Sequence, residues 1–304
     1  MPHRIAMRPP MRLRLATLAV VAALAAAGCG GAGGSPPPSG PSVVVTYSVL
    51  GAVVTELVGD HAAVTVLMAN GVDPHDWSPS AKDIERVMNA GIVVANGLGL
   101  EEGLAKTLEE AEKAGVAVFR ATDHIQVREL AEESDHAGGD PHFWVDPISM
   151  RDVVAALATE LAAAGIDVAD RSADLQQRLV DLDAEARETL AVVPETGRKL
   201  VTGHESMGYF ADRYGFQIVG TVIPGLSSQG EVSAGELAAL KAQIEAEGVS
   251  AIFTEIGTPA AVVEAVGRET GVEVVELPSH TLPDDGSYFT FIRQIASDVA
   301  GALR

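Results

Sequence analysis

The feature that most constrains the fold is an alternation of short β-branched segments with helical patterns, which occurs twice. In the first half of the chain the expected strands lie at 43–50, 63–68, 92–95 and 116–119. In the second half they lie at 200–202, 217–223, 251–254 and 272–277. Strands separated by helices pair in parallel. The sequence therefore predicts an α/β protein with two parallel-sheet lobes.

One long amphipathic helix is expected between the two blocks. Residues 171–191 are rich in charge, and their leucines fall broadly on one stripe: Leu175, Leu179, Leu182 and Leu190. We expect an N-terminal α/β lobe at 43–169, a linker helix at 170–195 and a C-terminal α/β lobe at 196–304. The long helix would join the two lobes.

The N-terminus has the features of an export signal. In residues 1–28 four arginines precede an apolar run that ends in small residues, an order typical of secretory signals. Cys29 follows directly, where a lipoprotein signal places the residue to be acylated. A Gly-, Ser- and Pro-rich tether at 29–42 would then link the protein to the extracytoplasmic face of the plasma membrane. The alternative is an ordinary secretory signal with an incidental cysteine.

Charge and cysteine content narrow the function classes. The formal net charge of -21 argues against nucleic acid as a partner, because phosphates require a basic face. Cys29 is the only cysteine, so a lipidated protein can form no disulfide. Any metal site must therefore use nitrogen and oxygen ligands.

Two short segments nearly repeat each other. Residues 73–77 read DPHDW and residues 140–144 read DPHFW, and they contain both tryptophans of the chain. A proline restricts its own backbone and that of the residue before it, so each histidine follows a stiff dipeptide. A side chain placed in advance is a good metal ligand. Either segment alone could be a surface turn, but the matching flanks favour a shared site.

Four histidines lie where predicted strands or their following loops end. His75 and His142 belong to the first lobe, and His204 and His280 belong to the second. Ligands collect at the carboxyl ends of parallel strands, so these side chains can meet in the cleft between the lobes. A tetrahedral set of imidazoles suits Zn²⁺.

The chain resembles the zinc- and manganese-type solute-binding proteins of bacterial ABC importers, the helical-backbone metal receptors. The resemblance covers nearly the whole mature chain and is carried by residues 71–79, 96–101, 140–147 and 203–210. It implies two α/β lobes bridged by a long helix. It also implies that His75, His142 and His204 are metal ligands.

The fourth ligand is where this chain departs from that family. The family usually has an aspartate after the last strand, whereas residues 277–282 here read LPSHTL. His280 is the candidate replacement. Asp284 or Asp285 would serve instead if the loop runs longer.

Other polar residues near these motifs have two interpretations each. Glu205 adjoins a predicted ligand, and Glu255 ends an apolar strand, so either can lie behind the ligands and orient them. Glu255 can instead be an acid near a helix N-terminus. His124 and His136 flank the loop before His142, where zinc-binding members of the family often have a histidine-rich segment. We interpret both first as surface residues and second as weak metal-capture sites.

The resemblance and the four histidines together imply a monomeric, non-enzymatic receptor that binds Zn²⁺ as a transported ligand, with Mn²⁺ less favoured. It would deliver the ion to an ABC importer permease with its ATPase. One alternative is a secreted zinc hydrolase with three histidines, an open position and Glu205 as general base. Others are a manganese receptor or a surface adhesin of the same family.

Overall fold

A computed structural model describes residues 42–129 and 138–304 of the chain. The predicted signal at 1–28, Cys29, the tether up to residue 41 and His136 lie outside these residues. Among the helices that are described, none has both the length and the apolar character needed to cross a membrane.

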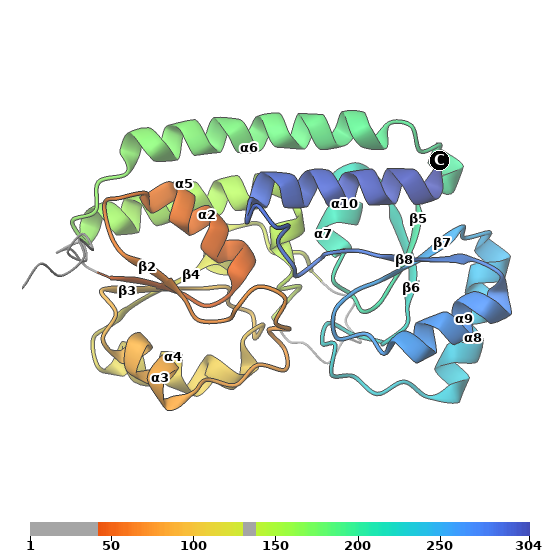
Figure 1. Ribbon diagram of the computed structural model, residues 1–304, viewed down its shortest axis with the longest axis horizontal. Helices are drawn as coiled ribbons and strands as arrows, with labels where there is room; N and C mark the ends of the chain where they lie inside the picture. Colours follow the sequence, from red (N-terminus) through yellow and green to blue (C-terminus); the bar gives the residue numbers. More distant parts are fainter. Residues whose placement is uncertain (1–41, 130–137) are drawn as a thin grey trace, which may run out of the picture. The chain divides into compact units, whose positions relative to one another are not determined.

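The first lobe contains a four-stranded parallel sheet in the order β2-β1-β3-β4. Its strands are β1 (Val43–Val45), β2 (Val64–Val66), β3 (Ile92–Ala95) and β4 (Ala117–Arg120). The helical segments around it are α2 (Ser48–Val58), α3 (Ala81–Met88), η1 (Glu102–Leu104), α4 (Ala105–Lys113), η2 (Ala121–His124) and α5 (Pro147–Ala163). Helices α3 and α4 cover one face, and α2 and α5 cover the other (Figure 1). Both faces of the sheet are therefore buried, as parallel sheets require.

The second lobe repeats this arrangement. Its parallel sheet has the order β6-β5-β7-β8. The strands are β5 (Lys199–Thr202), β6 (Gln217–Thr221), β7 (Ala251–Thr254) and β8 (Glu273–Glu276). The helices are α7 (Gly208–Tyr214), α8 (Ala234–Glu247), α9 (Ala260–Thr270) and α10 (Tyr288–Leu303). Helices α8 and α9 pack on one face of the sheet through an apolar cluster that includes Val201, Leu240 and Val263.

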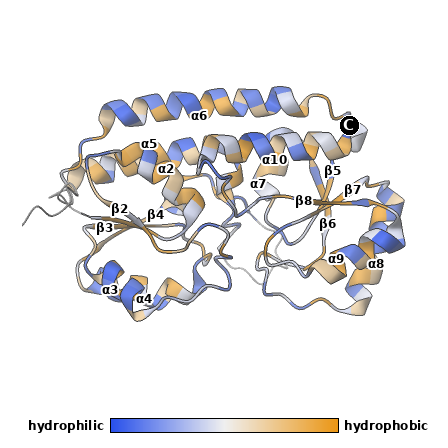
Figure 2. Cartoon of the chain, viewed as in Figure 1, coloured by the Kyte–Doolittle hydropathy of each residue, from blue (hydrophilic) through white to orange (hydrophobic). Residues whose placement is uncertain are grey.

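Helix α6 (Ala169–Leu190) connects the lobes. It packs along α5 of the first lobe and α10 of the second (Figure 1). Its four stripe leucines, Leu175, Leu179, Leu182 and Leu190, are buried, while hydrophilic residues occupy its other side (Figure 2). The predicted fold class, two parallel α/β lobes joined by one long helix, is confirmed.

One predicted strand boundary differs from the structure by several residues. The predicted strand at 43–50 is too long, because β1 ends at Val45 and α2 begins at Ser48. The apolar residues Val49 and Leu50 fit a buried strand as well as a buried helix face, and they lie on the buried face of α2. In α9 Pro259 is the N-cap residue, and no side chain caps that helix. By contrast, Ser80 and Ser233 form the complete capping boxes of α3 and α8.

The packing of α6 leads to a stability prediction. Leu179 is fully buried, so Leu179→Ala should lower the free energy of unfolding by about 2–5 kcal/mol in urea denaturation. The neighbouring Val180 is 38% exposed, and Val180→Ala should stay within about 0.5 kcal/mol of the parent protein. Equal effects of the two substitutions would contradict the helix orientation described above.

Candidate metal centre

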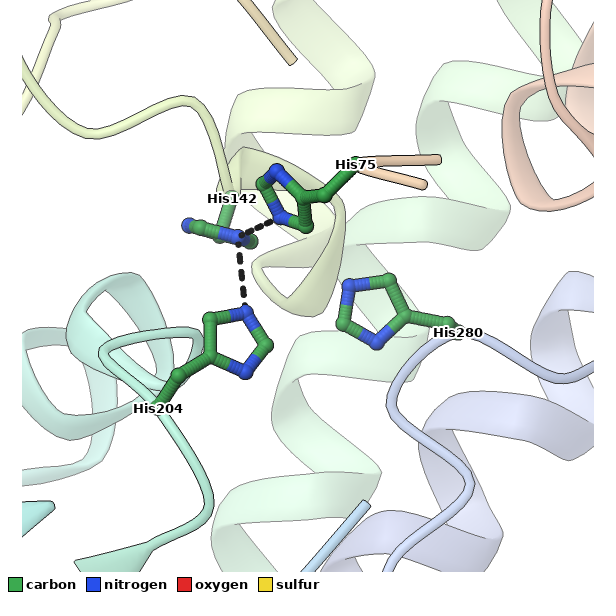
Figure 3. Close-up of side chains that lie close together, drawn as sticks. All are labelled: His75, His142, His204 and His280. Carbon is green, nitrogen blue, oxygen red and sulfur yellow. Dashed lines mark hydrogen bonds between the residues drawn. The ribbon is translucent and has the colours of Figure 1, made fainter. Parts of the chain in front are cut away.

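Four buried imidazoles converge between the two lobes. His75 lies in the loop after β2, and His142 lies directly before the short helix η3 (Phe143–Val145). His204 follows β5 and His280 follows β8. One ring nitrogen from each lies within 4.8 Å of the others, and Figure 3 shows the rings pointing toward one another. The structure therefore brings together all four histidines singled out in the sequence.

The repeated Asp-Pro-His segments share a backbone hydrogen bond. The Asp73 carboxylate accepts from the backbone N–H of His75 at 3.0 Å, and the Asp140 carboxylate accepts from that of His142 at 2.9 Å. An aspartate that bonds the backbone two residues ahead forms a local turn. The aspartate and the proline together fix the start of each histidine loop. Proline is therefore not the only source of the stiffness expected from the sequence.

Two of the separations between ring nitrogens match those of a tetrahedral zinc shell. His142 Nε2 lies 3.2 Å from His75 Nε2 and 3.3 Å from His204 Nε2 (Figure 3). Zn–N bonds of about 2.0–2.1 Å place adjacent donors of a tetrahedron about 3.3–3.4 Å apart. These two separations are therefore close to those that a zinc ion bound by imidazoles requires.

Two buried carboxylates set the orientation of the rings. Asp140 Oδ1 lies 2.9 Å from His142 Nδ1, and Glu255 Oε1 lies 2.8 Å from His204 Nδ1. A carboxylate at Nδ1 favours the tautomer with the proton on that nitrogen. The lone pair of Nε2 is then directed toward the centre. Carboxylate–histidine pairs of this kind also increase the basicity of a metal-binding imidazole.

The Glu255 carboxylate contacts residues around both His204 and His280. Its carboxylate accepts from the backbone N–H of His204 at 3.1 Å and from the hydroxyls of Ser206 and Ser279. It also lies 3.8 Å from His280 Nδ1. Burial opposes its charge, but His204, His280 and the hydroxyl of Ser279 outweigh burial and hold the pKa of Glu255 well below its usual range. The buried carboxylate is therefore ionised and touches two of the four imidazoles or their backbone.

The four imidazoles differ in basicity. Burial, reinforced by the neighbouring rings, lowers the pKa of His75 to about 2. Burial lowers the pKa of His280 to about 3 and also lowers that of His142. For His204 burial acts in the same direction, but the Glu255 carboxylate outweighs it and raises the pKa. Three rings are thus neutral over the physiological range, and one readily takes a proton.

Trp144 supports the centre across the lobes. Its ring centroid lies 5.2 Å from those of both His142 and His280. Its Nε1–H donates to the carbonyl oxygen of Ser279 at 2.7 Å. Asp140 and Ser279 contribute polar contacts that the sequence analysis did not single out. The only sequence signal for Asp140 was that both repeated segments begin with an aspartate.

The other candidate residues lie apart from the four rings. Among the residues described, the Glu205 carboxylate makes no hydrogen bond to the imidazoles, and its backbone N–H donates to Gly225. Asp284 is exposed, and the exposed Asp285 accepts hydrogen bonds from Ser287 and Thr290 at the start of α10. His124 is exposed and stacks on Phe119 at 4.5 Å. His280, rather than either aspartate, therefore completes the cluster.

Known proteins are similar to this chain in sequence and in fold. Residues 43–302 match the protein family described as ZnuA, zinc-uptake complex component A, periplasmic. The chain is 31% identical over 240 residues to the manganese-binding lipoprotein MntA of Halalkalibacterium halodurans, a match that covers 77% of each chain. It is 30% identical over 255 residues to the zinc-binding protein TroA of Treponema pallidum, covering 82% of this chain and 80% of TroA.

The solved structure of that TroA, described as a periplasmic zinc-binding protein, has the same fold. The superposition has a TM-score of 0.78 at 30% sequence identity, and it covers 87% of this chain and 99% of TroA. Family match, sequence identity and fold agree over the same region. The chain belongs to the ZnuA family of periplasmic zinc-uptake components.

Proposed function

We propose that this protein is an extracytoplasmic receptor that binds Zn²⁺ through His75, His142, His204 and His280 and delivers it to an ABC import permease with its ATPase. The observation that carries this proposal is the convergence of four buried imidazoles within 4.8 Å. The neutral state of three of them and the two supporting carboxylates agree with a site prepared for a cation. Family membership supports the transport role.

The choice of zinc rests on the donor set. Four imidazole nitrogens suit Zn²⁺, whereas Mn²⁺ prefers sites with more oxygen ligands. Relatives are named for both metals, so the family alone does not decide between them. His280, where the family usually has an aspartate, favours the nitrogen-rich alternative.

Binding and release, rather than catalysis, is the role that we propose. A shell of four protein ligands leaves no position for a reactive water, unlike catalytic zinc sites. The hydrolase alternative needs Glu205 as a general base. Among the described residues, the carboxylates that pair with the imidazoles are those of Asp140 and Glu255, not that of Glu205. No described feature favours the adhesin alternative.

The proposed location is the outer face of the plasma membrane. Relatives named as lipoproteins support acylation of Cys29 after removal of residues 1–28, with residues 29–42 as the tether. We further propose lobes at 43–169 and 196–304 joined by the segment 170–195, in a monomeric receptor. Metabolic labelling with a radioactive fatty acid tests the anchor, since Cys29→Ser should abolish incorporation.

The ligand assignment predicts one tightly bound Zn²⁺ per chain. His142→Ala should weaken zinc binding by at least about 100-fold, because losing a direct ligand should exceed the roughly 10- to 100-fold effect of losing a supporting contact. His124→Ala, an exposed histidine outside the cluster, is the matched control and should leave Kd unchanged. Elemental analysis and competition with a chromophoric chelator measure both. A parent protein that stays metal-free in excess zinc would refute the proposal.

The donor set also predicts how metal preference can be altered. His280→Asp replaces a nitrogen donor with an oxygen donor and should lower the ratio of zinc affinity to manganese affinity. Asp285→Asn, at an exposed position engaged with α10, is the control and should leave that ratio unchanged. The same ratio in the parent and His280→Asp proteins would show that position 280 is not a ligand.

The imidazole pKa values predict release of about one proton per zinc bound near pH 6. His204, with its raised pKa, is protonated in the metal-free protein as pH falls through that value, which lies above about 6.5. His75 and His280 remain neutral until pH about 2 and 3. Just below the raised pKa of His204, Kd should therefore rise about tenfold per unit decrease in pH.

Calorimetry in buffers of different ionisation enthalpy measures the number of protons released. Glu255→Gln removes the charge that raises the His204 pKa, so it should reduce proton release at pH 6. Glu276→Gln, at an exposed site on β8, should not. Release of three or four protons by the parent protein would contradict the assignment of His204 as the one basic ligand.

A further inference from the structure

A small cavity lies beside His75, at one side of the four-histidine cluster. The cavity has a volume of about 90 Å³ and is lined in part by His75. His75 is also the most exposed of the four histidines, at 8%, compared with 4% for His280 and 0% for His142 and His204. An ion that reaches the cluster from this side therefore meets His75 first.

Both lobes contribute to the wall of this cavity. Leu98 and Pro141 come from the first lobe, and Leu226 comes from the second. The polar side chains of the wall, besides His75, are Glu102 and Ser227. Glu102 is the one carboxylate in the described lining, and it is exposed to solvent. The cavity thus combines an apolar wall with one negative charge at its exposed side.

The turn that forms this wall is held in a specific conformation. Leu98 has a φ of 52°, in the left-handed region, and the glycines on both sides also have positive φ. The buried Glu101 carboxylate accepts from the backbone N–H groups of Asn96 and Gly97. Non-glycine residues with positive φ are uncommon and persist only where their surroundings impose them. Glu101 therefore holds the turn from inside while the next residue, Glu102, faces the cavity.

A divalent cation cannot pass an apolar wall unless other groups replace the water that it loses. Carboxylate and hydroxyl oxygens are suitable replacements. A negative group at the mouth of a low-dielectric passage also raises the local cation concentration and the association rate. In this cavity Glu102 can provide both effects.

We propose that Zn²⁺ enters and leaves through the cavity beside His75, and that Glu102 binds the ion transiently on the way. The hydrated ion exchanges water for a Glu102 carboxylate oxygen and then exchanges that oxygen for the imidazole nitrogen of His75. No proton or electron is transferred between Glu102 and the ion. This inference rests on the proposed function. Glu102 affects the rates of zinc binding and release and is not a ligand of the bound ion.

The test is a stopped-flow measurement on the full-length mature protein with Zn²⁺ as the probe. Trp144, in contact with the cluster, provides a fluorescence signal, and excess chelator gives the dissociation rate. Glu102→Gln should lower the association rate constant by about three- to tenfold. Because entry and exit share one pathway, the dissociation rate constant should fall by a similar factor, and Kd should change by less than about twofold.

Glu109→Gln is the matched control, because Glu109 lies on the adjacent helix α4, is exposed and carries the same charge. Both rates of this control should match the parent protein. As a second variant, Leu98→Ala widens the cavity and should raise both rate constants. Added salt should slow association of the parent more than that of Glu102→Gln, since screening acts on the charge that the substitution removes.

Rates of Glu102→Gln equal to those of Glu109→Gln would overturn the proposal. A Kd that rises only through faster dissociation would also overturn it, because Glu102 would then be a ligand of the bound ion. Unchanged rates in Leu98→Ala would show that the ion does not use this cavity. A parent protein that binds no zinc would instead reject the proposed function, so the two failures are distinguishable.

Discussion

The structure depends on keeping four imidazoles close together in a buried site without a positive charge on each. Burial keeps three rings neutral, because a charged imidazole is disfavoured away from water. Asp140 and Glu255 supply the compensating negative charge and orient His142 and His204. The rings can then direct their lone pairs at a common point. With three rings already neutral, such a site would release few protons on binding a cation.

Contacts between the lobes also help to keep the four imidazoles at their spacing. Asn70 makes two hydrogen bonds with the backbone of Leu282, at 2.8 and 2.7 Å, and so ties the first lobe to the segment after His280. Arg213 of α7 forms a bidentate pair with Asp146, which also caps α5. Each contact lies within a few residues of a cluster histidine or of its supporting loop. Movement of one lobe against the other would therefore change the spacing of the imidazoles.

Much of this protein could be predicted from local patterns. The alternation of strands and helices predicted both lobes, and the leucine stripe predicted the buried face of α6, because periodicity reports which side of an element is buried. The boundary at residues 46–50 was less accurate, because the apolar residues there fit a strand and a helix equally well.

The sequence by itself determined the fold class and the four histidines worth examining, because strand ends and stiff Asp-Pro turns are local features. Only the tertiary structure decided that His280 rather than Asp284 or Asp285 joins the cluster, since this depends on the path of one loop after β8. The tertiary structure alone also showed that Glu255 lies near both His204 and His280, and that Glu102 lines a cavity beside His75. These relations join residues that are far apart in the chain, so no local pattern records them.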